Sequence, residues 1–158
     1  MSAVGAEHHY RLAVNWTGNR GSGTSGYREY DRAITVGAEG KPDLLASADR
    51  TFHGDASRWN PEEMLVAALS TCHLLSYLHV AVNAGVVVTA YDDVPVGTMT
   101  QQGIGGHFTE VWLRPVVTVA EESMVDRAMA LHHDAGEACF IAASVNFPVR
   151  HDPRVVVG

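Results

Sequence analysis

Hydrophobic and polar residues alternate near the start of the chain, and the period becomes helical after residue 60. In residues 10–16, Leu12, Val14 and Trp16 alternate with more polar neighbours, which predicts a half-buried strand. The glycine-rich segment 17–26 predicts a tight turn, and residues 27–37 predict a second strand that completes a hairpin. A further short strand is expected at 44–47.

The signals for a helix after residue 60 are local and complete. Asn60 can cap the helix, Pro61 suits its first position, and Glu63 can reach back to the cap. We expect a helix over 61–83 that ends at Gly85.

This helix has two adjoining apolar stripes and almost no charge between residues 64 and 83, so little of it is expected to face water. We therefore expect it at the centre of the fold. The stripes are Leu65, Leu69, Cys72, Ser76 and His79, and Met64, Ala68, Thr71, Leu75, Leu78 and Val82.

The second half of the chain returns to a strand pattern. Residues 86–101 and 107–119 predict a long hairpin, with Pro95 and Pro115 at bulges or edges. A helix over 121–135 stopped by Gly136, a short helix over 137–144 and a last strand over 145–151 are expected to follow. This order predicts an α+β fold in a single domain, 1–158, with antiparallel hairpins before and after a buried helix.

Composition and charge exclude several function classes. A chain of 158 residues, 46% hydrophobic, is long enough for one domain with a substantial core. The formal charge of −7 and the lack of a basic run argue against nucleic acid and an anionic membrane as partners. Residues 64–82 are broken by polar side chains, which predicts a core helix rather than a membrane span. The N-terminus has no basic segment followed by an apolar stretch, so a cytoplasmic location is expected.

The chain has only two cysteines, Cys72 within the apolar helix and Cys139 near the C-terminus. A lone cysteine in a core helix is most often a small buried hydrophobe. In a reducing cytoplasm, a pair of cysteines is catalytic, redox sensing, metal binding or simply buried. The residues alone leave these four alternatives open.

Two segments that contain the cysteines carry a family resemblance. "NPEE" at 60–63, with a cysteine ten residues after Glu62, and "EACFIA" at 137–142 resemble the two signature segments of the osmotically inducible protein C / organic hydroperoxide resistance (OsmC/Ohr) family. "RGSGT" at 20–24 resembles the early arginine turn of that family, whose members are thiol peroxidases. The resemblance covers about residues 10–150.

The resemblance implies an α+β intertwined homodimer with antiparallel sheets around a buried central helix. It implies that Cys72 is the peroxidatic thiol, Cys139 the resolving thiol, and Arg20 and Glu62 an activating pair. The implied activity is reduction of organic hydroperoxides in oxidative stress defence, with an external dithiol as reductant and no cofactor or metal. The chain departs from the best-known members at Phe140, where they have proline, and at His73.

The chemistry of peroxide cleavage gives the same residues definite tasks. An apolar shell keeps a thiol protonated, so a thiolate nucleophile there needs a cation, and a guanidinium stays charged when it is desolvated. Arg20 is the first candidate and Arg58 its rival, with Glu62 as a partner for the buried charge. Glu62 and Cys72 lie roughly 15 Å apart along one helix, so two antiparallel copies of the helix would bring them together across a two-fold axis.

Cys139 is the only other thiol available to rescue a Cys72 sulfenic acid. Its position after Gly136, in the first turn of the expected short helix, predicts a lowered pKa for Cys139.

Two other interpretations compete with the peroxidase. The nine histidines and two cysteines suggest metal binding, but they lack CxxC and HxxxH spacings; His8, His9 and His151 are expected at the surface. Candidate ligands would be Cys72, His73, His79, His107, His132, His133 and Cys139. The second interpretation is a non-enzymatic or weakly active binding or redox-sensing protein whose aromatic residues surround an apolar ligand. Loss of free thiol on adding an organic hydroperoxide separates it from the enzyme.

Overall fold

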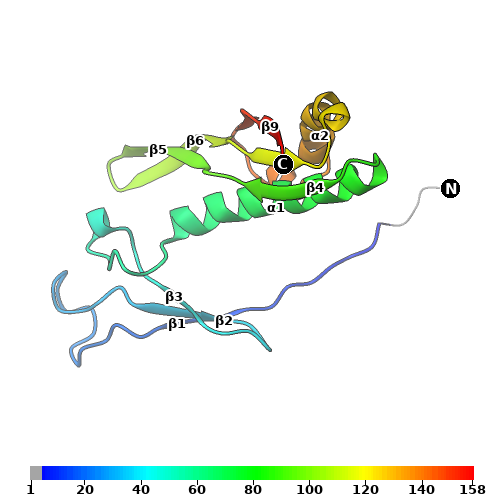
Figure 1. Cartoon of the computed structure of the whole chain (residues 1–158). Coiled ribbons are helices and arrows are strands. Elements are labelled where there is room, and N and C mark those ends of the chain that lie inside the picture. The colour runs from blue at the N-terminus through cyan, green and yellow to red at the C-terminus, as the bar shows by residue number, and fades with distance from the viewer. Residues whose placement is uncertain (1–4) are drawn as a thin grey trace. The chain divides into compact units, whose positions relative to one another are not determined.

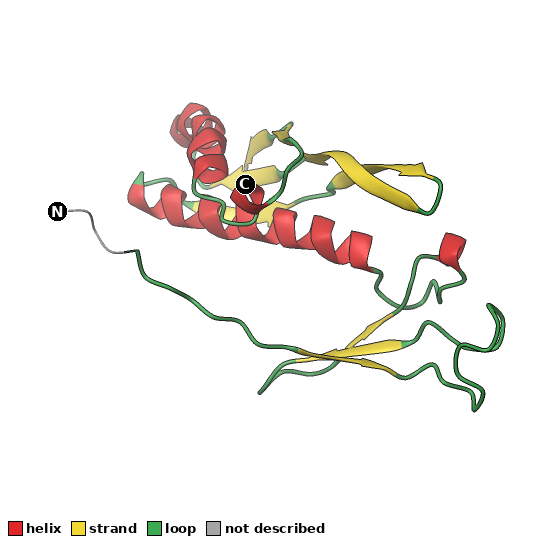
Figure 2. Cartoon of the chain, turned by 180° about the vertical axis from the view of Figure 1, so that it is seen from behind, coloured by secondary structure: helices red, strands yellow, loops and turns green. Residues whose placement is uncertain are grey.

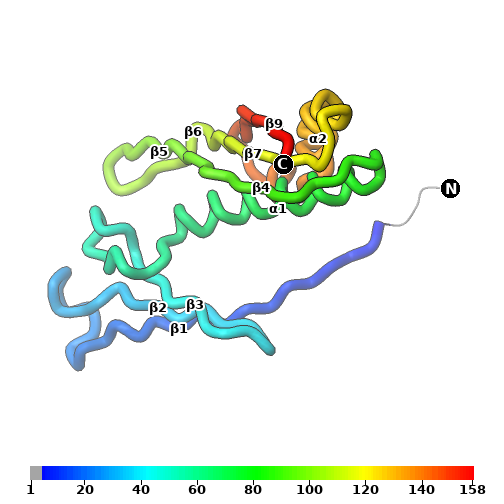
Figure 3. The backbone as a smooth tube through the Cα atoms, in the orientation of Figure 1, coloured from blue at the N-terminus to red at the C-terminus, as the bar shows by residue number. Residues whose placement is uncertain are grey.

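The structure is a computed structural model that describes residues 5–158. The chain forms two units: unit 1 comprises the described residues up to Met64, and unit 2 comprises Leu65–Gly158. Figure 1 labels the elements, and Figure 3 traces the path of the chain.

Unit 1 is built on an antiparallel sheet of three short strands. Strand β1 (Ala13–Trp16) pairs with β2 (Ile34–Gly37), which also pairs with β3 (Leu44–Ala46). The expected strand over 27–37 is therefore mostly loop, and only an isolated bridge from Tyr30 to Asn19 extends the pairing. A 3₁₀ turn, η1 (Arg50–Phe52), precedes the helix.

The expectation of a half-buried strand over 10–16 is wrong for the chain by itself. All four residues of β1 are exposed, and Leu12, Val14 and Trp16 are among the exposed large hydrophobic residues. Alternation is typical of a strand with one buried face. In unit 1 the Tyr30 ring packs edge-on against Trp16 at 5.8 Å, but Leu12 and Val14 stay exposed.

Helix α1 (Pro61–Asn83) has the expected bounds, because both of its ends are set by local signals. The Asn60 side chain accepts a hydrogen bond from the Glu63 backbone N–H at 2.8 Å, and the Glu63 carboxylate accepts from the Asn60 N–H at 3.2 Å. This is a complete capping box. At the other end, Gly85 adopts a φ of 71°, which favours glycine and turns the chain away from the helix axis.

Unit 2 contains the expected long hairpin, broken in both arms. Strand β4 (Val88–Asp92) pairs with β7 (Val116–Val119), and β5 (Val96–Gln102) pairs with β6 (Gly105–Leu113). Pro95 and Pro115 lie at the two breaks, as their lack of a backbone donor predicts. Two C-terminal strands, β8 (Val149–His151) and β9 (Arg154–Val157), add in parallel to β6 and β7. Only one strand was expected there.

Helix α2 (Val125–Glu137) follows a 3₁₀ turn, η2 (Glu122–Met124), and continues through Gly136, where a stop was expected. Gly136 has another role: a Cβ there would lie 3.0 Å from Cε1 of His151. The glycine thus lets β8 approach α2. The expected short helix over 137–144 is reduced to the 3₁₀ turn η3 (Ala142–Ser144), preceded by a loop that holds Cys139.

Within unit 2, α1 lies along one face of the strands, as Figure 2 shows from behind. One core cluster joins Tyr77 and Ala81 of α1 to β7 and α2, and the other joins Leu69 to Val111 and Leu113 of β6. The buried face of α1 is Leu69, His73, Tyr77 and Ala81, a four-residue repeat that neither expected stripe contains in full.

The expectation that little of α1 faces water does not hold for a single chain. Leu75 is 61% exposed and Val82 is 77% exposed. Among the described residues, α1 is the one helix long and apolar enough to cross a membrane by length and composition, with a mean hydropathy of 1.6. A central helix of a water-soluble protein meets the same criterion.

Candidate functional site: a pair of thiols between two helices

Cys72 lies near the middle of α1 in unit 2. Its side chain is half-buried, while the next residue, His73, turns into the core. A helical step of about 100° separates neighbouring side chains, so Cys72 stays partly exposed while His73 packs. The Cys72 side chain is therefore partly accessible in the single chain.

Cys139 lies in the loop between α2 and η3 and is only 2% exposed. The backbone N–H of Ala142 donates to its Sγ at 3.4 Å, and the N–H of Ala143 donates to its carbonyl oxygen at 3.1 Å. The backbone of this loop therefore donates to the Cys139 sulfur, as a backbone N–H donates to the side chain that caps a helix.

The structure brings the two thiols together. The Cys72 thiol lies close enough to the Cys139 side chain to shift its pKa, and both cysteines are free. Burial and, after it, the Cys72 thiol raise the pKa of Cys139 to about 11, although the N–H of Ala142 acts in the opposite direction. The expectation of a lowered pKa for Cys139 is wrong, because η3 starts only after Cys139 and burial outweighs the backbone donors.

Three histidines of unit 2 have stacked rings, and one of them, His73, follows Cys72 in the chain. We call His73, His132 and His151 the histidine stack. The His73 ring lies 4.3 Å from that of His151 and 5.4 Å from that of His132, with interplanar angles of 24° and 12°. Nε2 of His73 is 3.1 Å from Nδ1 of His132, a hydrogen bond between α1 and α2. Tyr77 continues the stack, 4.3 Å from His132.

The histidine stack is neutral at physiological pH. Burial lowers the pKa of His73 to about 3, assisted by His151 and His132, and lowers the pKa of His132 to about 4. The pKa of His151 is lowered too, again chiefly by burial, although the Asp93 carboxylate opposes the shift.

The sequence interpretation missed this stack and placed His151 at the surface. His151 is in fact half-buried against His73. The available signal was the four-residue spacing of His73 and Tyr77 with Leu69 and Ala81, which marks one helix face. Because the rings are nearly parallel, their nitrogens do not converge on one point. Within residues 5–158, no group of three or more His, Cys, Asp or Glu side chains is arranged to hold a metal ion.

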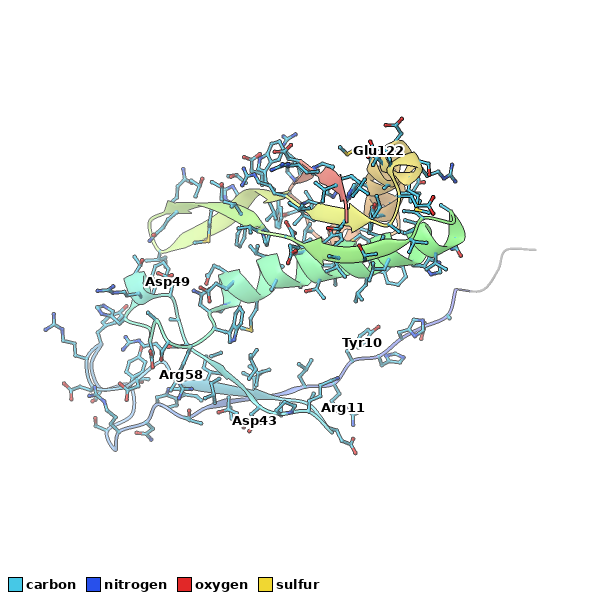
Figure 4. All side chains as sticks on the ribbon, viewed as in Figure 1. Tyr10, Arg11, Asp43, Asp49, Arg58 and Glu122 are labelled. Atoms are coloured by element: carbon cyan, nitrogen blue, oxygen red, sulfur yellow. The ribbon has the colours of Figure 1, made fainter. Side chains whose placement is uncertain are left out.

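The two candidate arginines lie in unit 1 with partners of their own. Arg20 is half exposed, hydrogen bonds to the carbonyl of Arg28 and lies 3.9 Å from the Asp31 carboxylate. Arg58, labelled in Figure 4, is more buried and lies 3.7 Å from the Asp55 carboxylate. It lines a polar pocket of about 420 Å³ with Asp31, Ser47 and Asp55, all within unit 1.

Glu62 stands in the first turn of α1, in unit 1. Its Oε2 is buried and has no hydrogen-bond partner in the part of the chain that the structure describes. A buried carboxylate oxygen without a donor is unfavourable by about 1–3 kcal/mol or more, which makes Glu62 a site that needs a cation or donor.

The family model for OsmC-like proteins matches residues 54–153, which include both cysteines and Glu62. The chain belongs to the OsmC-like family. No curated protein matches it significantly.

Solved structures of OsmC-like proteins have the same fold. An OsmC-like protein of unknown function from Vibrio cholerae is 31% identical, with a TM-score of 0.83 over 93% of this chain and 99% of that one. An organic hydroperoxide resistance protein from Elizabethkingia anophelis is 16% identical, with a TM-score of 0.67 over 97% of this chain and 100% of its own. An organic hydroperoxide resistance protein OsmC from Legionella pneumophila is 18% identical, also at 0.67, over 96% and 98%. At these lower identities the likeness concerns the fold.

Phe140 follows the second cysteine directly. Phe140 is 79% exposed, so its ring does not fill the space around the thiols. Its carbonyl oxygen accepts a hydrogen bond from Ser144 Oγ at 2.7 Å, which closes the turn that carries Cys139.

Proposed function

We propose that this OsmC-like protein is a thiol peroxidase that reduces organic hydroperoxides in oxidative stress defence. The observation that carries the proposal is the contact between a half-buried thiol, Cys72, and a fully buried one, Cys139, on two packed elements of unit 2. The names of the Elizabethkingia and Legionella proteins point in the same direction.

The accessible thiol acts first. The Cys72 thiolate attacks one peroxide oxygen, the O–O bond breaks, and the other oxygen leaves and takes up a proton as an alcohol. Cys72 is then a sulfenic acid. Cys139 is buried and its pKa is raised to about 11, so it stays a protonated thiol while Cys72 reacts.

Cys139 acts second. Its sulfur attacks the sulfenic sulfur, the Cys139 proton leaves with the displaced hydroxyl as water, and a Cys72–Cys139 disulfide forms. An external dithiol then reduces this disulfide to two thiols and is itself oxidised to a disulfide. The N–H of Ala142, which already donates to the Cys139 sulfur, stabilises negative charge that develops there.

Arg20 and Glu62 complete the site in this proposal, across a homodimer. Oε2 of Glu62 is buried without a hydrogen-bond partner among residues 5–158, which supports a role as acceptor for a guanidinium. The exposed apolar residues of α1 support a second copy as their cover. Arg58 is the alternative cation. We place the enzyme in the cytoplasm, where dithiol reductants are available and no nucleic acid or membrane partner is needed.

Organic hydroperoxides are the preferred substrates, because an exposed aromatic side chain lies next to one of the thiols. Phe140 adjoins Cys139 and is 79% exposed. An apolar contact of about 60 Å² at about 25 cal/mol per Å² is worth roughly 1.5 kcal/mol, or about tenfold in kcat/KM. Hydrogen peroxide has no apolar tail to make this contact.

The test is kcat/KM for cumene and tert-butyl hydroperoxides against hydrogen peroxide, with dithiothreitol as reductant. We expect the organic substrates to be favoured by about tenfold. A ratio near one would overturn the substrate preference, and no turnover with any peroxide would favour a non-enzymatic binding or sensing role.

A further inference from the structure

Contacts between α1 and α2 run in order toward the two cysteines. The Tyr77 hydroxyl donates to the carbonyl of Ala128 at 2.9 Å, near the start of α2. His132, one turn later, stacks on Tyr77 and hydrogen bonds to His73. Ser76 Oγ then lies 3.5 Å from the Ala138 carbonyl oxygen, and the next residue, Cys139, contacts Cys72.

The His73–His132 hydrogen bond is the one direct polar link between side chains in this series apart from the thiols themselves. It joins the residue after Cys72 to a residue two turns before Cys139. Both rings are almost fully buried, at 1% and 3% exposure. A neutral pair shares one proton, so the link has a defined direction and length that apolar packing alone does not impose.

The His73–His132 hydrogen bond also carries a free-energy cost, which argues that the two histidines do more than fill space. His73 Nδ1 and His132 Nε2 are buried without a hydrogen-bond partner among the described residues. In a neutral pair one of these nitrogens carries a proton and the other does not, so a donor and an acceptor are both unsatisfied. Two apolar side chains of similar volume would avoid this cost.

A defined link matters here because disulfide geometry is narrow. The S–S bond is about 2.05 Å long, and the two Cα atoms must lie about 4.4–6.8 Å apart. Cys139 sits in a loop whose placement against α1 depends on its attachment to α2, on the Ser76–Ala138 hydrogen bond and on the packing of Ile141 and Ala142 in the cluster of Leu69. A displacement of about 1 Å is enough to slow a reaction between fixed groups a hundredfold.

We propose that His73 and His132 are positioning residues whose hydrogen bond sets the approach of Cys139 to Cys72 for disulfide formation. This inference rests on the proposed function for its biological purpose, but the disulfide itself can be examined without a peroxide.

The experiment measures the equilibrium between the dithiol and the Cys72–Cys139 disulfide in buffers of reduced and oxidised glutathione. One oxidised glutathione takes two electrons and two protons from the thiols and becomes two reduced glutathiones. The equilibrium constant then reports how well the folded protein presents one thiol to the other. Maleimide tagging of free thiols gives the oxidised fraction.

The test variant is the double substitution His73→Leu with His132→Leu, which removes the link and leaves no orphaned partner. His132→Asn is the rescue variant, since its amide can replace Nδ1 as a partner for His73. His133→Gln, at the exposed neighbouring position, is the control.

We expect the double variant to lower the equilibrium constant by about tenfold or more, while His132→Asn and His133→Gln stay within about twofold of the parent. A double variant that folds and keeps the parent constant would overturn the proposal and leave the histidines as packing. If the double variant does not fold, His132→Leu takes its place against His132→Asn, and equal constants for those two would overturn the proposal.

A failure of the proposed peroxidase function would give a different result from a failure of the positioning role. A protein that forms the disulfide in glutathione and loses it with the link, but consumes no hydroperoxide, would support the positioning role and refute the peroxidase.

Discussion

Two identical side chains do different work when their surroundings differ, and Cys72 and Cys139 lie in opposite surroundings. Cys72 is half-buried on a helix, whereas Cys139 is enclosed by its own turn and keeps its proton because burial raises its pKa to about 11. The order of the two thiols in the proposed cycle follows from this difference.

Two substitutions decide which arginine activates the Cys72 thiol. We expect Arg20→Ala to slow the reaction of Cys72 with cumene hydroperoxide by about tenfold to a hundredfold, because a charge-assisted contact of about 1.5–3 kcal/mol is lost. Arg58→Ala should have a small effect. Stopped-flow measurement of the first turnover checks this, and the reverse order of effects would assign the role to Arg58.

The capping box at Asn60 gives a prediction about stability. Asn60→Ala removes the acceptor for the Glu63 N–H and should lower the free energy of unfolding by about 1 kcal/mol, whereas Asn60→Asp keeps an acceptor and serves as the control. Urea denaturation measures both, and equal midpoints for Asn60→Ala and the parent would contradict the role of the cap.

At the scale of elements, the histidine stack ties α1 to α2 and to β8 with neutral rings. In the unfolded chain a histidine titrates near its ordinary pKa of 6.5, whereas the folded pKa values are about 3 for His73 and about 4 for His132. Between these limits the unfolded state binds more protons. Stability therefore falls as the pH falls from about 6.5 toward 4.

We expect the loss of stability at acid pH to be smaller when His73 and His132 are both replaced by leucine. Each buried neutral histidine contributes about 1.4 kcal/mol per pH unit to the slope of stability against pH. Urea midpoints at pH 7, 6 and 5 should fall less steeply for His73→Leu with His132→Leu than for the parent. Parallel slopes would mean that these rings are not the source of the acid sensitivity.

Features that depend on neighbouring residues could be predicted from the sequence, whereas features that depend on distant segments could not. The bounds of α1 depend on Asn60, Glu63 and Gly85, which act within a few residues, and they were predicted correctly. The parallel pairing of β8 with β6 joins distant segments, and nothing local encodes it. For the same reason Gly136 was interpreted as a helix stop, when its purpose is to admit His151 from β8.

The candidate site likewise has one part that the sequence could predict and another part that it could not. The spacing of Cys72 from the "NPEE" segment was visible in the sequence, and the structure brings Cys139 to it. The raised pKa of Cys139 was not predictable, because it depends on burial by segments that meet only in the fold. The roles of Arg20 and Glu62 stay predictions.

At the scale of the whole molecule, a single chain leaves apolar surface on α1 and β1. Val82 and Val14 are 77% and 67% exposed, which is unfavourable in water and favours a second copy as cover. We expect a homodimer that persists at micromolar concentration. Sedimentation equilibrium should give twice the chain mass, and a stable monomer would contradict the proposed assembly.

The central claim is that Cys72 is oxidised first and Cys139 resolves it, and the mass of the intact protein after one equivalent of cumene hydroperoxide tests it most directly. The parent should lose two hydrogens as the disulfide forms, Cys139→Ser should gain one oxygen as a sulfenic acid that dimedone traps, and Cys72→Ser should be unchanged. A sulfenic acid on Cys139 in the Cys72→Ser variant, formed at the parent's rate, would contradict the account.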